Sequence, residues 1–344
     1  MPDQGLSYRD AGVDLDAAER AKARLKELVA STRDRYTLSE LGLFGGLYQV
    51  PEGMDAPVLV SSADGVGTKL KVAFQAGRHD TVGQCLVNHC VNDILVQGAR
   101  PLFFLDYLAT GEMDETVVAQ VVSGVAVACK ENACALLGGE TAQMPDFYAA
   151  DEYDLAGFIV GIVERGRILD GSAIREGDTL LGLASSGLHT NGYTLARRIV
   201  FDRMGLAVDD ELPGTGRSVA DELLAVHRSY LPALGPLLEQ GRVHGLAHIT
   251  GGGIPGNLPR VLPEGLGAVV DRGSWPVPAV FRTLQDGGGV ERSEMDRVFN
   301  MGIGMIAVVD PGDAEAVRSS LADGGVEAWA LGTVEAGQGV RYVG

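Results

Sequence analysis

The sequence has few cysteines, and their spacing is typical of neither a disulfide scaffold nor a zinc ribbon. Four occur in 344 residues, at positions 85, 90, 129 and 134, and no two are separated by exactly two residues as in a Cys-x-x-Cys pair. A disulfide scaffold needs a higher cysteine density, and a zinc ribbon needs closely spaced pairs. We therefore expect reduced and mostly buried thiols, as in a cytosolic protein.

Long apolar runs are missing as well. The run Gly157–Val163 has the length of a strand, and the run Val117–Cys129 is interrupted by Gln120 and Ser123. A membrane span needs ~20 apolar residues. The first residues carry neither a basic region nor an apolar stretch, so we expect no signal peptide. These absences predict a soluble, cytoplasmic protein without a membrane partner.

Positive charge is scarce. The chain has 28 lysines and arginines against 46 acidic residues, which gives a formal net charge of −18. Such a surface repels nucleic acids and anionic lipids, so we expect neither as a partner. A nucleotide phosphate would have to be held by local backbone N–H groups, by lysine or arginine, or by a metal ion, because the overall field opposes it.

The length and the patterning predict two mixed domains. A chain of 344 residues exceeds the size at which one hydrophobic core stops growing. Helical and strand patterns alternate in both halves, which is typical of an α/β or α+β fold. The polar stretch 165–178 separates the halves, so we expect an N-terminal domain over residues 1–167 and a C-terminal domain over residues 168–344. The predicted strands are 58–62, 102–108, 135–137, 155–163, 179–184, 267–271, 303–309 and 328–333, and the main predicted helices are 15–28, 81–97, 114–130, 193–204, 219–226, 229–240, 278–286 and 312–324.

The segment Asp64–Lys69 (Asp-Gly-Val-Gly-Thr-Lys) is the first that could carry chemistry. Gly65 and Gly67 let backbone N–H groups turn toward a phosphate, and Lys69 adds a positive charge. Asp64, at the end of a strand, could hold Mg²⁺. The spacing is not that of a Walker A loop. An ordinary Asp-Gly turn is the competing interpretation, and composition alone does not decide between them.

A polar stripe interrupts the otherwise apolar helix predicted over 81–97. Its members are Asn88, His89, Asn92 and Asp93, which fall on one face at ~100° per residue. A solvated face usually carries long charged side chains, and this stripe has none. The stripe therefore either lines a site or forms a locally satisfied polar patch.

Two carboxylates occur in or beside apolar strands. Glu140 follows Gly138 and Gly139 at the end of a short predicted strand, where the glycines permit close backbone approach. Asp106 lies inside an apolar run, where a buried carboxylate is costly unless it is paired or bound to a metal. Strand alternation could equally point Asp106 outward, and we leave that choice open.

Two loops of the second half could bind an anion. The segment Ser185–Tyr193 follows a strand and opens a helix, and it contains His189 and Asn191. The competing interpretation is that Thr190 or Asn191 only caps the helix. The segment His248–Gly256 contains Gly251, Gly252 and Gly253, which suit a phosphate-binding turn better than a dinucleotide site.

Taken in order, these segments resemble the phosphoribosylformylglycinamidine cyclo-ligase family, the aminoimidazole ribonucleotide synthetases of purine biosynthesis. The resemblance covers nearly the whole chain, and its most specific part is the opening Ser7–Asp14. The other matching segments are Asp64–Leu70, Cys90–Asp93, Pro101–Tyr107, Gly138–Ala142, Ser185–Tyr193, His248–Gly253 and Phe299–Asn300. The Asp-Gly-Val-Gly-Thr-Lys and Gly-Gly-Glu-Thr segments are shared more widely within the same ATP-binding superfamily.

The resemblance implies a fold and a reaction. The N-terminal α/β domain would supply strands for a homodimer, the C-terminal α/β domain would fold over it, and ATP would bind in a cleft between them. ATP would phosphorylate the formyl amide oxygen of formylglycinamidine ribonucleotide. The amidine nitrogen would then close the imidazole ring of 5-aminoimidazole ribonucleotide as phosphate leaves. Phosphoryl transfer needs positioning and charge neutralisation more than a nucleophilic side chain.

The resemblance also implies roles for particular residues. Asp64, Asp93 and Glu140 would hold Mg²⁺ and nucleotide. His189, Asp93 and Lys69 would be catalytic, with Lys69 on the phosphates and His189, beside Asn191, on the transferring phosphoryl group or the substrate amide. The nucleotide-binding set would comprise Lys26, Asp64, Gly65, Gly67, Thr68, Lys69, Gly139, Glu140, Asn191, Gly251, Gly252 and Gly253.

Two alternatives stay open. One is another enzyme of the superfamily, such as a thiamine monophosphate kinase, a selenophosphate synthetase or a hydrogenase-maturation dehydratase, which lack the Ser7–Asp14 opening. The other is a catalytically silent nucleotide-binding subunit, which loss of the carboxylates would favour. Asp64, Asp93 and Glu140 are all present, which favours an enzyme.

Overall fold

The N-terminal half of the chain forms one sheet backed by helices in a computed structural model, which describes residues 15–40 and 44–344. The family-specific opening Ser7–Asp14 lies outside those residues. In chain order the elements are α1 (Leu15–Ala30), β1 (Pro57–Gly65), η1 (Gly67–Lys69), α2 (Leu70–Ala76), α3 (Asp80–Leu95), β2 (Arg100–Thr110), α4 (Glu115–Glu131), β3 (Ala135–Gln143) and β4 (Tyr153–Glu164).

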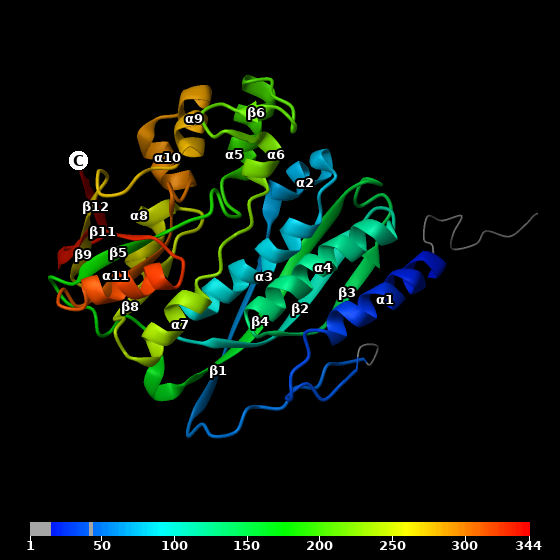
Figure 1. Cartoon of the computed structure of the whole chain (residues 1–344), viewed down its shortest axis with the longest axis horizontal. Coiled ribbons are helices and arrows are strands. Elements are labelled where there is room, and N and C mark those ends of the chain that lie inside the picture. The colour runs from blue at the N-terminus through cyan, green and yellow to red at the C-terminus, as the bar shows by residue number, and fades with distance from the viewer. Residues whose placement is uncertain (1–14, 41–43) are drawn as a thin grey trace, which may run out of the picture.

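The four strands of this sheet have the order β1-β4-β2-β3. Only β2 and β3 run parallel to each other, while β4 is antiparallel to both β1 and β2. The helices α3, α4 and α1 lie side by side against the sheet (Figure 1). The helix α3 is thereby placed between the N-terminal sheet and the C-terminal half of the chain.

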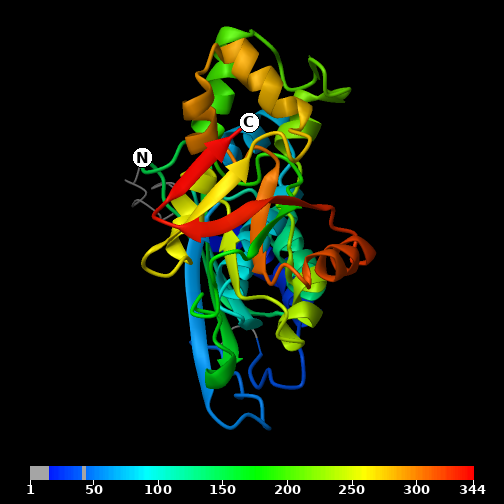
Figure 2. The same cartoon turned by 90° about the vertical axis from the view of Figure 1, so that its left-hand side faces the viewer.

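The C-terminal half is built on a six-stranded sheet with the order β12-β9-β11-β5-β10-β8. Figure 2, viewed from the side of β9, β11 and β12, shows this sheet in front of the N-terminal half. Buried apolar residues of both halves belong to one continuous cluster, so the two sheets share a core. The elements are β5 (Thr179–Ala184), α5 (Tyr193–Arg197), the π-helix η3 (Arg198–Arg203), β6 (Glu211–Leu212), β7 (Arg217–Ser218), α6 (Val219–Leu223), α7 (Leu231–Glu239), β8 (Gly245–His248), α8 (Gly253–Asn257), β9 (Leu266–Asp271), α9 (Ala279–Gly288), α10 (Arg292–Val298), β10 (Ile303–Val309), α11 (Ala314–Asp323), β11 (Ala328–Ala336) and β12 (Val340–Val343).

The mixed α/β prediction is confirmed, and most predicted elements are present. All four cysteines are free and buried, as the composition predicts. Several short segments were not predicted, because elements of two to seven residues carry little periodicity. They are α2, β6, β7, β8, α8, α10 and β12. Among the described residues, no helix has the length and apolarity to cross a bilayer.

The strand β3 does not stop at its glycines, which corrects the expected end at residue 137. It continues to Gln143, pairing with β2 through Gly138 and Gly139. A Cβ on Gly139 would lie 2.4 Å from the Asp106 Oδ1, so glycine here makes room for a neighbouring carboxylate. Asp106 is buried, so the outward alternative is wrong, and burial raises its pKa to about 7.

The helices α3 and α4 approach each other so closely that glycine is required at their contact. A Cβ on Gly124 would lie 1.9 Å from the Asp80 carbonyl oxygen, and one on Gly83 would lie 2.2 Å from the Val121 carbonyl oxygen. Both obstructing atoms belong to backbone and cannot move aside. This contact determines how far α3 stands from α4, and therefore where the polar stripe of α3 lies.

We expect Gly124→Ala to lower the free energy of unfolding by about 1–3 kcal/mol, because the added methyl group forces the helices apart. Urea unfolding measures the change. Gly166→Ala is the matched control, since a Cβ there meets nothing within 4 Å, and its effect should stay within about 0.5 kcal/mol. Equal effects of the two substitutions would contradict this account of the helix contact.

Candidate active site

Four of the six histidines meet between the two halves of the chain. His89 comes from α3, His189 from the loop after β5, His227 from the connection between α6 and α7, and His248 from the end of β8. The ring centroid of His227 lies 3.9 Å from that of His189, 5.2 Å from that of His89 and 5.2 Å from that of His248. All four side chains are buried. The cluster joins residues that are far apart in sequence.

The N-terminal carboxylates anchor this cluster. His89 Nε2 donates to Asp64 Oδ2 at 2.8 Å, and His248 Nδ1 donates to Asp93 Oδ1 at 2.8 Å. The second oxygen of Asp93 accepts from the Ser62 hydroxyl at 3.0 Å. Asp64 and Asp93, which the sequence predicts to act together, therefore flank the same group of histidines.

The polar stripe of α3 contacts the C-terminal half of the chain, and its two asparagines are satisfied by backbone groups there. Asn88 Nδ2 donates to the His227 carbonyl, and Asn92 Nδ2 donates to the Arg228 carbonyl, each at 2.8 Å. Asn92 Oδ1 accepts from the Tyr230 backbone N–H at 3.0 Å. These bonds hold the segment 227–230 against α3.

His227 is the hub of the cluster, and the sequence patterns did not single it out. Its Nε2 lies 3.1 Å from the Nε2 of His248, and its Nδ1 lies 3.3 Å from the Thr190 hydroxyl. Its ring stacks on that of His189 with an interplanar angle of 18°. Only its position among buried polar partners identifies it, because it stands in no motif.

Charge is distributed unevenly over the cluster. Burial alone would raise the pKa of Asp64 and lower the pKa of His89. The hydrogen bond between them outweighs burial, so the pKa of Asp64 lies below its usual value and the pKa of His89 lies above its usual value. Burial likewise opposes a lowered pKa at Asp93, yet its bond to His248 and the nearby charge of His89 prevail. One edge of the cluster is therefore ionic.

The opposite edge is neutral. Burial lowers the pKa of His248, against the pull of Asp93. Burial, reinforced by the charges of neighbouring histidines and of Lys69, holds the pKa values of His189 and His227 well below the usual range. Their imidazoles are uncharged at neutral pH and can accept a proton or bind an electrophilic centre.

The His189 loop presents unsatisfied polar atoms. His189 has a φ of +62°, unusual for a residue other than glycine. Its Nε2 accepts from the Ser186 backbone N–H at 3.1 Å, but its buried Nδ1 has no partner. The buried Nδ2 of Asn191 has none either. Buried polar atoms are normally satisfied, so two free ones in one loop indicate a place for a ligand.

The glycine turn predicted to cradle a phosphate lies beside this loop. Gly252 and Gly253 have φ values of +99° and +60°, and a Cβ on Gly251 would lie 3.3 Å from the Asn191 Oδ1. The Asn257 amide donates to the Gly251 and Gly253 carbonyls, which holds the turn in shape. The structure thus brings Asn191 and the glycine turn together.

Lys69 is placed differently from what its motif suggests. Its side chain is completely buried, and its ammonium donates to the carbonyls of His189 (3.0 Å) and Ala225 (2.6 Å). It also lies 3.1 Å from Cys85 Sγ. Lys69 therefore links the N-terminal loop to the strained residue His189. The adjacent Thr68 contacts Thr194 of α5 across the same boundary at 2.9 Å.

Three other residues that were predicted to bind nucleotide or Mg²⁺ lie away from the histidine cluster. Lys26 is an exposed residue of α1, which lies on the far side of α4 from α3 (Figure 1). Gly139 and Glu140 lie on the edge strand β3, three strands from Asp64 in the sheet order, which corresponds to roughly 14 Å at the usual strand spacing. Within one chain, Glu140 and Asp64 cannot share a single metal ion.

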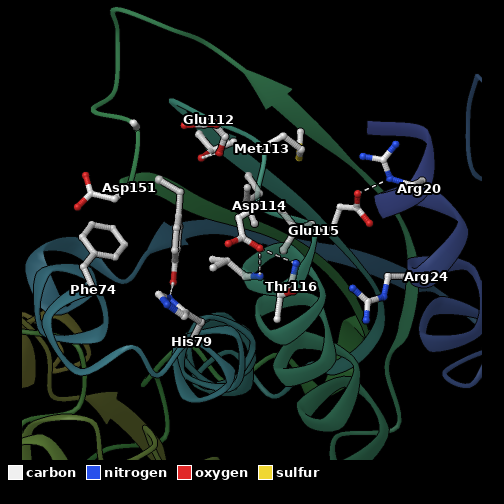
Figure 3. A pocket seen from close by; sticks show the side chains of 16 residues that line it. Arg20, Arg24, Phe74, His79, Glu112, Met113, Asp114, Glu115, Thr116 and Asp151 are labelled. Carbon is white, nitrogen blue, oxygen red and sulfur yellow. Dashed lines mark hydrogen bonds and ion pairs between the residues drawn. The ribbon is translucent and has the colours of Figure 1, made fainter. Parts of the chain in front are cut away.

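A cavity of about 720 Å³ lies at the N-terminal ends of α3 and α4, and none of the predicted site residues lines it. Figure 3 shows Arg20 and Arg24 of α1 on one wall and the start of α4 on another, with Asp114 capping the helix through bonds to the Thr116 and Val117 N–H groups. Its acidic residues outnumber its arginines. The cavity and the histidine cluster are separate features.

Comparisons with known proteins identify relatives over the whole length. The models named AIR synthase related protein, N-terminal domain and C-terminal domain, match residues 47–163 and 175–344. A phosphoribosylformylglycinamidine cyclo-ligase of Sorangium cellulosum is 55% identical and covers 96% of this chain and 95% of its own length. One from Burkholderia multivorans is 53% identical, covering 97% and 94%.

Solved structures share the fold at lower identity. The thiamine-monophosphate kinase of Stenotrophomonas maltophilia superposes with a TM-score of 0.70 at 20% identity, over 96% of this chain and 97% of its own. A hydrogenase maturation protein HypE in complex with ATP gives 0.64 at 19% identity, over 95% and 89%. At such identities the likeness concerns the fold alone.

The lowered pKa of His227 predicts a loss of stability in acid. An unfolded histidine takes up a proton near pH 6.5, whereas folded His227, facing His189, His248, His89 and Lys69, does not. As the pH falls from about 7.5 to about 5.5, the unfolded state gains protons and the free energy of unfolding should fall, by at most about 1.4 kcal/mol per pH unit and proton. The melting temperature should fall with it. Calorimetry should show that the melting temperature of His227→Gln falls less over this pH range than that of the wild type. Equal falls would contradict the lowered pKa of His227.

Proposed function

The chain belongs to the phosphoribosylformylglycinamidine cyclo-ligase family, and on that premise we propose that the histidine cluster between its two domains is the ring-closing site. The protein is an ATP-dependent ligase of purine biosynthesis, and it converts formylglycinamidine ribonucleotide into 5-aminoimidazole ribonucleotide with release of ADP and phosphate. Its acidic surface opposes nucleic acid and anionic membrane as partners, so the small nucleotide substrate, in the cytoplasm, would be held by local donors.

The chemistry accounts for the kind of residues at the site. An amide oxygen is a poor leaving group, and transfer of a phosphoryl group from ATP converts it into a good one. The amidine nitrogen then forms a bond to the same carbon, loses a proton, and phosphate leaves. Such a sequence needs oriented donors, a cation and a proton acceptor, but no nucleophilic side chain.

Asp64 and Asp93 suit Mg²⁺, the ion that ATP chemistry calls for. Their pKa values lie below the usual range, so both are ionised at neutral pH. Their side chains remain 42% and 25% exposed, so an ion could reach them. When bound, Mg²⁺ would neutralise phosphate charge. We assign Asp64 and Asp93 to one ion, and Glu140, with Lys26 and Gly139, to a different part of the nucleotide site.

His189 and Asn191 suit the phosphoryl group or the substrate amide. Each has a buried nitrogen without a partner, and the glycine turn Gly251–Gly253 lies beside them. Backbone N–H groups of such a turn, and those of Gly67 and Thr68 in the loop after β1, are the usual donors to phosphate oxygens. The Gly65 N–H donates to Asp64 Oδ1 and would support that carboxylate instead. We assign to neutral His189 the task of accepting the proton that the amidine nitrogen loses as the ring closes.

Lys69 would stabilise the loop that carries His189, and it would influence phosphate binding only through that loop. Its ammonium holds the carbonyl of His189, a residue with positive φ, and a direct phosphate contact would require breaking that bond. The observation that carries the whole proposal is that Asp64, Asp93 and His189, from three separate segments, join one histidine cluster: Asp64 through His89, Asp93 through His248, and His189 through His227.

We expect His189→Gln to lower kcat about 10²- to 10⁴-fold, since glutamine preserves polarity but cannot exchange a proton at neutral pH. Release of ADP that depends on formylglycinamidine ribonucleotide is the measurement, and it also separates this enzyme from a kinase relative or a silent subunit. His244→Gln is the control, because His244 bonds Asp178 outside the cluster. Turnover of the His189 variant at the control's rate would refute the site.

The outer face of the N-terminal sheet supports the proposed homodimer. On this face Phe158 lies between Ala63 and Leu105 in the strand register. Phe158 and Leu59 are 46% and 59% exposed, respectively. A flat apolar sheet face of this kind commonly marks an interface. We propose that the same face of a second copy covers it.

We expect Phe158→Asp to yield monomers in sedimentation experiments, because a carboxylate in an apolar interface would be desolvated without a partner. Val127→Asp is the control, since Val127 is an exposed apolar residue on α4 with 39% exposure. A monomeric wild-type protein, or dissociation of both variants alike, would argue against this interface.

A further inference from the structure

We propose that His189, His227 and His248 form a binding site for a divalent transition-metal ion of the zinc class, distinct in its ligands from the Mg²⁺ carboxylates. One ligand atom from each of the three residues lies within 4.8 Å of the other two, and all three side chains are buried. Three imidazoles with an open fourth position are a common ligand set for such ions.

The spacing of two nitrogens already matches a shared ion. His227 Nε2 and His248 Nε2 lie 3.1 Å apart. Two nitrogens bound at ~2.0–2.1 Å to one tetrahedral ion are about 3.3 Å apart. Asn92 Nδ2 also approaches His227 Nε2 at 3.2 Å. In the tautomer of His227 that carries its proton on Nδ1, the Nε2 lone pair faces Asn92 and His248 and is available to a metal ion.

The outer bonds of these histidines are those of metal ligands. A ligating histidine usually gives its other N–H to a carboxylate or another oxygen, which orients the ring and selects the tautomer. His248 bonds Asp93 through Nδ1 at 2.8 Å, and His227 meets the Thr190 hydroxyl through Nδ1 at 3.3 Å. Both rings therefore direct Nε2 toward the centre of the cluster.

His189 completes the set, although its ring has to turn. At present it stacks on His227, and parallel rings do not direct their lone pairs at one point. Its Nδ1 is buried and has no hydrogen-bond partner. Because Nε2 accepts the Ser186 N–H, the proton of the neutral ring is on Nδ1, and turning the ring to bind a metal ion breaks the Ser186 bond and frees a nitrogen lone pair.

The ligand type separates this site from the one for Mg²⁺. Imidazole nitrogens suit Zn²⁺, Co²⁺, Ni²⁺ and Cu²⁺, whereas Mg²⁺ prefers oxygen ligands and retains water. An ion bound here would take His189 out of the reaction, so we expect reversible inhibition. That inhibition rests on the proposed role of His189, whereas metal binding itself does not.

Titration of chelator-treated protein with Co²⁺ tests the proposal without reference to activity. We expect one equivalent to bind and to give the visible absorption of a tetrahedral Co²⁺ complex, which Zn²⁺ then removes. His227→Gln should weaken binding at least ~100-fold, and Thr190→Val, which removes only an outer bond, about tenfold. His244→Gln is the matched control and should bind as the wild type does.

Thermal melting of each variant distinguishes loss of the site from loss of the fold, and Thr190→Val keeps the test valid if His227→Gln does not fold. The proposal fails if Co²⁺ shows no saturable tetrahedral spectrum, or if the His227 and His244 variants bind equally well. If Zn²⁺ binds but ADP release continues unchanged, the metal site stands and the catalytic role of His189 falls.

Discussion

The contact between the polar face of α3 and the loops of the C-terminal domain is the interaction on which the rest of this structure depends. Asn88 and Asn92 form hydrogen bonds with backbone groups of the segment 227–230. His89 bonds to Thr190, and Asp93 bonds to His248. Buried polar groups are costly when unpaired, so this contact has essentially one acceptable alignment. The relative placement of the two domains follows from it.

That alignment creates two electrostatic environments within a few ångströms. On the side of Asp64 and Asp93, ion pairing overcomes burial, and charge is retained. On the side of His189 and His227, burial prevails and charge is removed. A reaction that needs both a bound cation and an uncharged proton acceptor can use such a boundary. The same neutrality makes the histidines available to a competing metal ion.

Much of the fold could be predicted from the sequence, because periodicity and capping are local properties. The cap of α4 at Asp114 and the strand β5 are examples. The end of β3 could not be predicted, since its glycines are explained by Asp106 on a neighbouring strand. For the site, Asp64, Asp93 and His189 were indicated by their segments. Lys69 was indicated too, but its buried bonds to carbonyls were not.

The sequence by itself determined the family, the mixed α/β class and the segments that carry carboxylates, glycines and His189, because those features depend on residues that are close together in the chain. Only the tertiary structure decided which of them meet. It placed Glu140 three strands from Asp64, and it made His227, a lone histidine between two short helices, the centre of the cluster. The physical reason is that burial and pairing partners come from elements distant in sequence, and these set both the charge of a side chain and what it can bind.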